Sequence, residues 1–493
     1  MLMAVVAVLG VLVAGWTLIG ELRREEIKVL ASLHRARIRE RCVLAGVVVL
    51  GSPVLMAWVF WEWPPTRAGE TLAGAIESIV LVAVTAYALW PIREALRLDR
   101  GLVWNLEHVQ AATGRIQELV RQGKASTAAA VVARFAPMVD RPKREDGELD
   151  AYEAVLDWCL RHEAFVEAMV NEQTEAVAEL LKAETGLRWW QADRLVTAAF
   201  TRPPYGLITE VADCTSPASY EPEHFIPPEC VLLHALADDP RVAERVGAWK
   251  SVGDAVVDEL RARRAGLSDH GVDVLSPDMN HEGFMKSPID AGIEFLHILA
   301  ARAVYEKLGD TIDVYYYKEF TRHILPLLPE PKPIGNISEQ TRYHWYLWQM
   351  LDNLQNLVFL RAPRLPDQNG GDGQHADDQP VSSMRRRCMK TYAWCVGEVV
   401  RSDHAPHQLK VDRVAQAVDF YGTLVTGMPM GYVELGQHAE VLLTELRIAF
   451  RSDFDQLVGL ANDPLSDVDL NAFSLFNKAM HKAKASPKPP PND

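Results

Sequence analysis

Three apolar stretches near the start of the chain constrain its fold more than any other feature. Residues 1–20 and 42–61 contain no charged side chain, and residues 72–90 contain only one, Glu77. Twenty helical residues rise about 30 Å, which is the thickness of the hydrocarbon core of a bilayer. Because backbone amides in lipid must be paired within their own segment, each stretch is predicted to be a transmembrane helix. Residues 1–91 are therefore predicted to form a three-helix membrane anchor.

The first stretch has a rival interpretation as a cleaved signal peptide. Such a peptide carries basic residues before its apolar run and a small-x-small cleavage site after it. Here no basic residue precedes the run, and the sequence Ile-Gly-Glu-Leu at 19–22 is a poor cleavage site. We therefore expect an uncleaved anchor.

The distribution of lysine and arginine predicts how the anchor is oriented. Seven lie in 21–41 and six in 92–124, whereas Arg67 is the one basic residue between the second and third stretches. Basic residues accumulate on the cytoplasmic side of membrane proteins. The sequence thus predicts an inner- or plasma-membrane protein with its N-terminus outside and a large cytoplasmic C-terminal domain.

Glu77 is the one acidic residue inside a predicted span. A carboxylate in lipid is costly and often functional, so an ion or proton role is one hypothesis. The favoured interpretation is milder, because Glu77 lies about a turn and a half from the outer end and can reach the interface. Gly74, Ser78 and Thr85 in the same stretch resemble a small-residue packing face.

Charge and cysteine content narrow the functions open to the rest of the chain. The whole protein has a formal charge of −15, and because the first hundred residues are slightly basic, residues 101–493 carry −17. A domain with this much negative charge repels polyphosphates over most of its surface. Nucleic-acid binding is therefore not expected. The six cysteines form no CxxC pair, and they are expected to be reduced core residues.

Helical periodicity and propensity dominate the sequence after the predicted anchor. The predicted fold class is all-α: three transmembrane helices followed by a large cytoplasmic helical domain with irregular Pro-rich loops. The best strand candidate is short, near 205–211. Helical regions are predicted over 125–200, 229–362 and 384–484, and within the second of them a helix is expected to begin at Pro288. The segments between and after these regions are predicted to be irregular: a Pro-rich boundary over 201–228, a flexible loop over 363–383 and a disordered tail over 485–493.

A membrane-proximal helix is predicted over 92–124. Its apolar residues recur at spacings of three and four, the period of a coiled-coil seam. One interpretation is an oligomerisation stalk, which makes a homo-oligomer the expected assembly; the other is an amphipathic helix packed on its own domain. The predicted seam comprises Leu102, Leu106, Val109, Ile116 and Val120.

Two polar clusters contain residue types that bind divalent metals. His270, Asp273, His281 and Glu282 could hold zinc, manganese or iron, since imidazole and carboxylate suit these ions. Their spacing matches no metal motif, and the Asp, Gly and Pro content around them favours a loop. His404 and His407 form a second cluster, and convergence of all four histidines would strengthen the metal hypothesis.

One basic cluster opens the last helical region. Arg385, Arg386, Arg387 and Lys390 are interpreted as a solvated face that could contact anionic lipid. Aromatic runs at 315–317 and 343–348 are predicted mainly to pack in the core. The alternative is a ligand or nucleobase pocket with Lys318 and Arg342.

The function predicted from these patterns is non-enzymatic. Phosphate-binding loops and nucleophile elbows are missing from the sequence. The main hypothesis is a membrane-anchored helical module for partner binding, sensing or scaffolding, with no resident cofactor. Its expected partners are the bilayer, further copies of itself and a cytoplasmic protein. The alternatives are a membrane-tethered metal-dependent hydrolase and an oligomeric effector that forms pores or perturbs the membrane.

Overall fold

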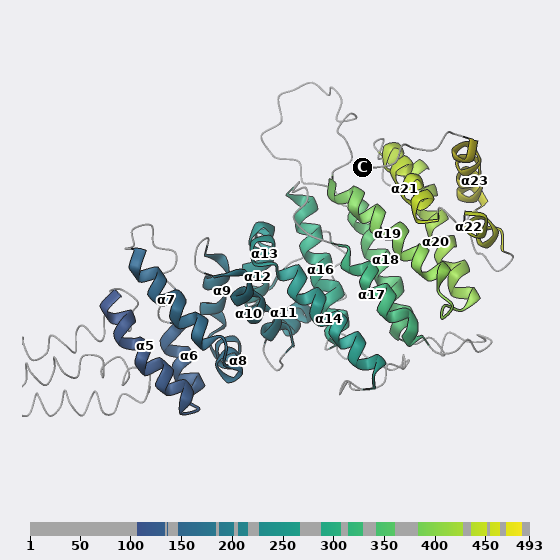
Figure 1. Ribbon diagram of the computed structural model, residues 1–493. Coiled ribbons are helices and arrows are strands. Elements are labelled where there is room, and N and C mark those ends of the chain that lie inside the picture. The colour runs from purple at the N-terminus through teal and green to yellow at the C-terminus, as the bar shows by residue number, and fades with distance from the viewer. Residues whose placement is uncertain are drawn as a thin grey trace, which may run out of the picture. The chain divides into compact units, whose positions relative to one another are not determined.

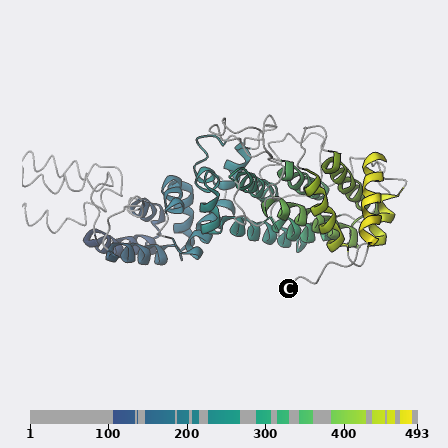
Figure 2. The ribbon, with the colours of Figure 1, turned by 90° about the horizontal axis from the view of Figure 1, so that it is seen from above.

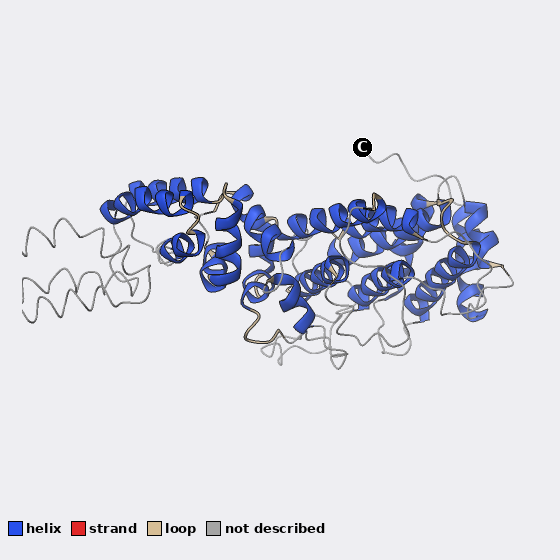
Figure 3. Ribbon diagram, turned by 90° about the horizontal axis from the view of Figure 1, so that it is seen from below, coloured by secondary structure: helices blue, strands red, loops and turns tan. Residues whose placement is uncertain are grey.

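The computed structural model describes a set of helical segments separated by gaps. They are residues 106–133, 136, 146–183, 187–201, 206–214, 226–266, 287–306, 314–328, 342–359, 383–426, 435–450, 454–463 and 470–485. Every regular element in these ranges is a helix, and no strand occurs in them (Figure 3). The predicted all-α class is confirmed for this part of the chain.

The predicted anchor does not fall in the described ranges. The three predicted spans and Glu77 lie outside them, as do most of the predicted loops over 363–383 and 485–493. Among the helices that are described, none is both long and apolar enough for a bilayer span. The three spans therefore stay a prediction.

The chain divides into two compact units, Met1–Gln191 and Ala192–Asp493. The first contains α5 (Leu106–Arg121), α6 (Ala125–Ala133), α7 (Asp146–Cys159), α8 (Glu163–Glu172) and α9 (Thr174–Lys182). Helix α5 packs on α6 and α7, α6 packs on α8, and α8 packs on α9 (Figure 1). Each helix thus contacts near neighbours in sequence.

Small residues and one glycine explain the close packing at the start of this unit. Gly123 adopts φ 74°, a left-handed conformation that favours glycine, and it ends α5 before the turn into α6. Helix α6 buries Ala128, Ala129 and Val132, whose short side chains let its backbone approach α8. Gly123 thus allows the turn between α5 and α6, and the small residues of α6 allow its close contact with α8.

The second unit holds the remaining helices. They are α11 (Leu207–Cys214), α12 (Val231–Ala237), α13 (Pro240–Val246), α14 (Ala248–Arg264), α16 (Pro288–Tyr305), α17 (Tyr316–Ile324), the 3₁₀ turn η2 (Leu325–Leu327), α18 (Arg342–Phe359), α19 (Ser383–Arg401), α20 (His407–Thr426), α21 (Leu435–Ala449), α22 (Phe454–Ala461) and α23 (Leu470–Ala485). Helix α10 (Trp189–Thr201) contains the residues at which the two units divide.

The predicted short strand near 205–211 is wrong, because α11 begins at Leu207. Its β-branched residues Ile208, Thr209 and Val211 suggested a strand. The buried residues are instead Leu207, Val211 and Cys214, which recur at helical spacings of four and three. Burial against α12 and α16 outweighs local β propensity here.

Packing in the second unit proceeds step by step along the chain. Helix α14 packs on α16 and α17, α16 on α18, α17 on α19, and α19 on α20 and α21 (Figures 1 and 2). Helix α20 then packs on α21, α22 and α23. Most of these contacts join helices that lie close together along the chain.

Helix α16 forms the core of this unit. Every residue from 288 to 301 is buried. The hydroxyl of Ser287 accepts a hydrogen bond of 3.3 Å from the backbone N–H of Ile289, and Pro288 occupies the first turn, where its missing donor costs nothing. The helix begins at Pro288, as the sequence predicts.

Candidate functional site

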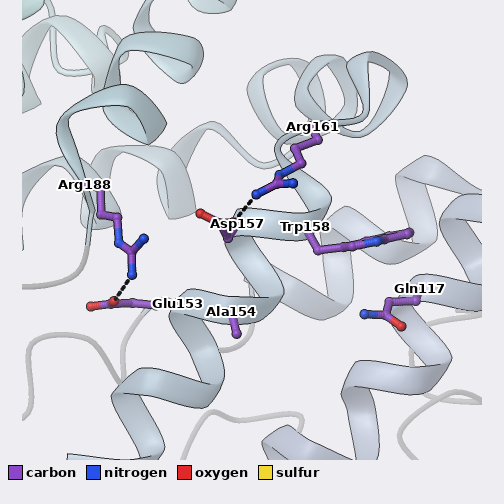
Figure 4. Close-up of a pocket in the computed structure, with 7 residues that line it drawn as sticks. All are labelled: Gln117, Glu153, Ala154, Asp157, Trp158, Arg161 and Arg188. Carbon is purple, nitrogen blue, oxygen red and sulfur yellow. Dashed lines mark hydrogen bonds and ion pairs between the residues drawn. The ribbon is translucent and has the colours of Figure 1, made fainter.

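A groove in the first unit lies beside Trp158, close to the C-terminal end of α7. It encloses a volume of about 470 Å³ and is lined by residues of α5 and α7 and of the segments that follow α7 and precede α10 (Figure 4). The lining residues are Gln117, Glu153, Ala154, Asp157, Trp158, Arg161 and Arg188. Packing of α5 on α7 places Gln117 near the indole.

Stacking interactions fix the position of the Trp158 ring. The imidazole of His162 lies 4.2 Å from it, centroid to centroid, and the Arg121 guanidinium lies 5.7 Å from the indole centroid. The Nδ1 atom of His162 is also 3.0 Å from the Trp158 carbonyl oxygen. A half-buried indole is therefore held in a defined orientation at the groove.

Two ion pairs border the groove and balance its charge. Arg161 donates to Asp157 at 2.8 Å, a helical i,i+4 pair, and Arg188 lies 3.7 Å from Glu153 (Figure 4). Both arginine side chains are exposed to solvent, so each pair is weak and easily rearranged. The groove can thus offer two guanidinium groups and two carboxylates to an incoming partner.

A second cluster of polar groups is buried where α16 packs on α18. Asp290, Glu294 and His297 follow one another at spacings of four and three residues, so they share one face of α16. The Tyr346 hydroxyl donates to Asp290 at 2.9 Å, and the Gln349 side chain hydrogen-bonds Glu294. These contacts fix how α16 lies against α18, because misaligned buried polar groups lose their partners.

Glu294 is the most perturbed carboxyl group in this cluster. It is almost completely buried, and loss of solvation raises its pKa to about 7, although the hydrogen bond with Gln349 acts in the opposite direction. Burial raises the pKa of the neighbouring Tyr317, and the charge of Glu294 raises it further. The Tyr317 hydroxyl stays protonated and donates to the Ile293 carbonyl at 3.0 Å.

The predicted metal ligands are not brought together in the described part of the chain. His270, Asp273, His281 and Glu282 lie outside it. His404 is exposed, and the Nε2 atom of His407 lies 2.8 Å from an Asp463 carboxylate oxygen. Within the described ranges, no three His, Cys, Asp or Glu side chains gather closely enough to hold a metal ion.

The predicted seam lies partly on α5. Leu102 is outside the described residues; Leu106 and Val109 belong to α5. Ile116 is fully buried within the chain, and Val120 is half-buried. Burial of Ile116 favours the interpretation in which this face packs on α6 and α7, and oligomerisation stays a prediction.

The predicted basic cluster lies on α19, with Arg386 and Lys390 exposed and Arg385 and Arg387 partly exposed.

The two aromatic runs each contain one fully buried tyrosine, Tyr317 and Tyr346, as core packing predicts. Trp345 and Trp348 instead remain exposed on α18, with ring centroids 4.7 Å apart.

The cysteines in the described ranges are free thiols, and all of them are buried, as expected. Cys214 and Cys230 approach to 4.0 Å between sulfur atoms, and burial raises the pKa of Cys230 to about 11. A protonated, buried thiol is a poor nucleophile.

Two of these features were missed by reasoning from the sequence. The groove joins Gln117, Trp158 and Arg188, which are far apart in the chain, and no local motif links them. The buried polar row did leave a signal, because three ionisable residues recur on one face of a helix that is otherwise apolar up to Arg302. Comparisons of the chain with protein-family models, with curated proteins and with solved structures found no match.

Proposed function

We propose that this protein is a membrane-anchored scaffold, without enzymatic activity, whose helical domain binds a partner protein at the groove beside Trp158. The observation that carries this proposal is the composition of the groove. It combines an oriented, half-buried tryptophan with exposed Arg161 and Arg188. Tryptophan and arginine are the residues that most often dominate protein–protein binding energy.

A protein segment suits this groove better than a small molecule does. Small-ligand sites are mostly apolar and have few polar groups. This groove is bordered by two exposed ion pairs, Arg161–Asp157 and Arg188–Glu153. A partner with both acidic and basic side chains could exchange with these pairs while an apolar side chain covers the indole.

The helix packing supports a scaffold in a second way. From α14 to α23, most contacts join helices that are one to three positions apart along the chain. Nearest-neighbour packing of this kind provides extended surface for binding proteins. The membrane anchor is the part of the proposal that rests on the three apolar stretches of the sequence.

Site-specific photo-crosslinking in cells tests the proposal on the full-length chain. A photoreactive residue at Ala154, which is exposed in the groove, should capture one specific protein. The same residue at Glu175, exposed on α9 outside the groove, is the matched control and should not capture it. Equal capture at both positions would refute a partner site in the groove.

Substitutions then measure the contribution of the groove to affinity for the captured protein. Trp158→Ala should weaken binding about 30-fold, the loss typical of a hot-spot residue. Arg161→Glu should also weaken binding and leaves the core untouched, since this side chain is exposed. Trp348→Ala removes an exposed tryptophan elsewhere and should leave affinity unchanged.

Metal analysis separates the scaffold from the hydrolase alternative. We expect purified full-length protein to carry no stoichiometric zinc, manganese or iron. About one metal ion per chain, lost in His270→Ala/His281→Ala, would replace the scaffold proposal with the hydrolase.

A further inference from the structure

A stripe of basic and aromatic residues runs along the least buried side of α19. It comprises the exposed Arg386, Lys390 and Arg401 and the half-buried Trp394 and Glu398, which recur every three or four residues. The ammonium group of Lys390 lies 4.7 Å from the centroid of the Trp394 ring. The stripe therefore combines positive charge with an indole.

Helix α17 packs on α19 (Figure 1), and its basic and aromatic residues join this stripe. The ammonium group of Lys318 lies 4.1 Å from the Trp394 centroid and 5.3 Å from that of Tyr315. Arg322 joins the two helices through an ion pair of 3.1 Å with Glu398. Two lysines on different helices thus share one indole; we call this surface the α17–α19 face.

The α17–α19 face is positively charged in an otherwise acidic domain. Its basic residues are Lys318, Arg322, Arg386, Arg387, Lys390 and Arg401, and its acidic residues are Glu319, Glu398 and the neighbouring Glu445. Residues 101–493 as a whole carry −17, so this face has the opposite sign to its surroundings.

The two lysines are free to meet an external anion. Neither ammonium group forms an ion pair with another residue in the described ranges, whereas Arg322 and Arg401 are paired with Glu398. Cation–π contact holds each lysine over the indole without neutralising its charge. Charge available for an external partner is thereby concentrated around Trp394.

We propose that the α17–α19 face docks on the anionic lipid headgroups of the membrane in which the protein is anchored. This inference rests on the membrane anchor of the proposed function and adds a second, peripheral contact with the bilayer. Lysine and arginine are attracted to anionic headgroups, and indole and phenol rings prefer the depth of those headgroups. The acidic remainder of the domain is repelled by the same surface, which selects this face for contact.

Energy transfer between the protein and the bilayer tests this docking on the full-length chain in lipid nanodiscs. A donor dye is attached at Ser383→Cys, the exposed start of α19, with Cys42→Ser to limit labelling elsewhere. Acceptor lipid is placed in discs of phosphatidylcholine alone or of phosphatidylcholine with phosphatidylserine. Transfer should be higher in discs with phosphatidylserine and should fall in high salt.

Matched variants tie the transfer to the α17–α19 face. Each basic residue near an anionic surface strengthens contact about fivefold, so Lys318→Gln/Lys390→Gln should lower the docking equilibrium constant about 25-fold. Arg241→Gln/Arg245→Gln removes the same charge from exposed positions of α13 and should keep docking. Lys318→Arg/Lys390→Arg should also keep docking, which separates loss of charge from loss of folding.

Several outcomes would overturn the proposal. They are equal transfer in both disc compositions, equal loss in the α13 control, and block of transfer by soluble glycerophosphoserine at low concentration, which would indicate a small-anion site instead of a bilayer contact. The groove variant Arg161→Glu should leave transfer unchanged. Failure of partner binding and failure of lipid docking can therefore be told apart.

Discussion

Replacing Glu294 with glutamine should stabilise the second unit at pH 8 and change its stability little at pH 5. Glu294 is buried on α16, and loss of solvation raises its pKa from 4.5 to about 7. Glutamine has nearly the same shape but carries no charge. Its amide can donate to the side-chain oxygen of Gln349, which has no hydrogen-bond partner in the described part of the chain.

The size of the effect follows from the linkage between protonation and folding. Between about pH 4.5 and pH 7 the unfolded chain has released the Glu294 proton while the folded chain still holds it, so stability falls as pH rises. The fall is about 1.4 kcal/mol per pH unit and amounts to about 3 kcal/mol above pH 7. Glu294→Gln should abolish this loss, which is fully present above pH 7 and absent below about pH 4.5.

Hydrogen exchange measured on α16 amides is the suitable assay. It reports the free energy of opening of that helix and does not require the full-length chain to unfold in one step. Protection in Glu294→Gln should exceed wild type about 100-fold at pH 8, after correction for intrinsic rates, and by less than about fivefold at pH 5. Glu244→Gln, at an exposed position of α13, is the control and should show no such pH dependence. An equal gain at both pH values, or destabilisation at pH 8, would refute the reasoning.

Three further predictions test the packing and the topology. Gly292→Ala should destabilise the second unit by about 1–3 kcal/mol, measured by thermal unfolding, because a Cβ atom there would lie 2.2 Å from a methyl group of Val256. Little change in stability would show that this contact relaxes freely. Ile116→Ala should cost the first unit about 2–5 kcal/mol by opening a cavity, measured by hydrogen exchange in α5, whether or not the chain oligomerises; a loss that depends on protein concentration would instead indicate a subunit interface. Reporter fusions at Asp493 should be active only on the cytoplasmic side and fusions within 64–69 only outside; external activity at Asp493 would mean that a span was miscounted.

Local sequence was enough to predict the class of fold and the start of α16. The helical class follows from residue propensity and from apolar residues repeated every three or four positions, both of which act within one helix. The start of α16 was readable in the same way, since Ser287 and Pro288 form a capping pair that needs no distant partner. The predicted membrane anchor, which lies outside the described residues, also rests on local sequence, because twenty uncharged residues suffice to predict a span.

Tertiary packing decided what local sequence left open or got wrong. Residues 207–211 include the β-branched Ile208, Thr209 and Val211, and burial of Leu207 and Val211 where α11 packs on α12 and α16 favours the helix. Lys318 and Lys390 meet over Trp394 only because α17 packs on α19. The groove beside Trp158 likewise exists only because α5 packs on α7 and Arg188 forms an ion pair with Glu153. Sites of this kind join residues separated by tens of positions, and the packing of several helices together sets their distances, so no single segment encodes them.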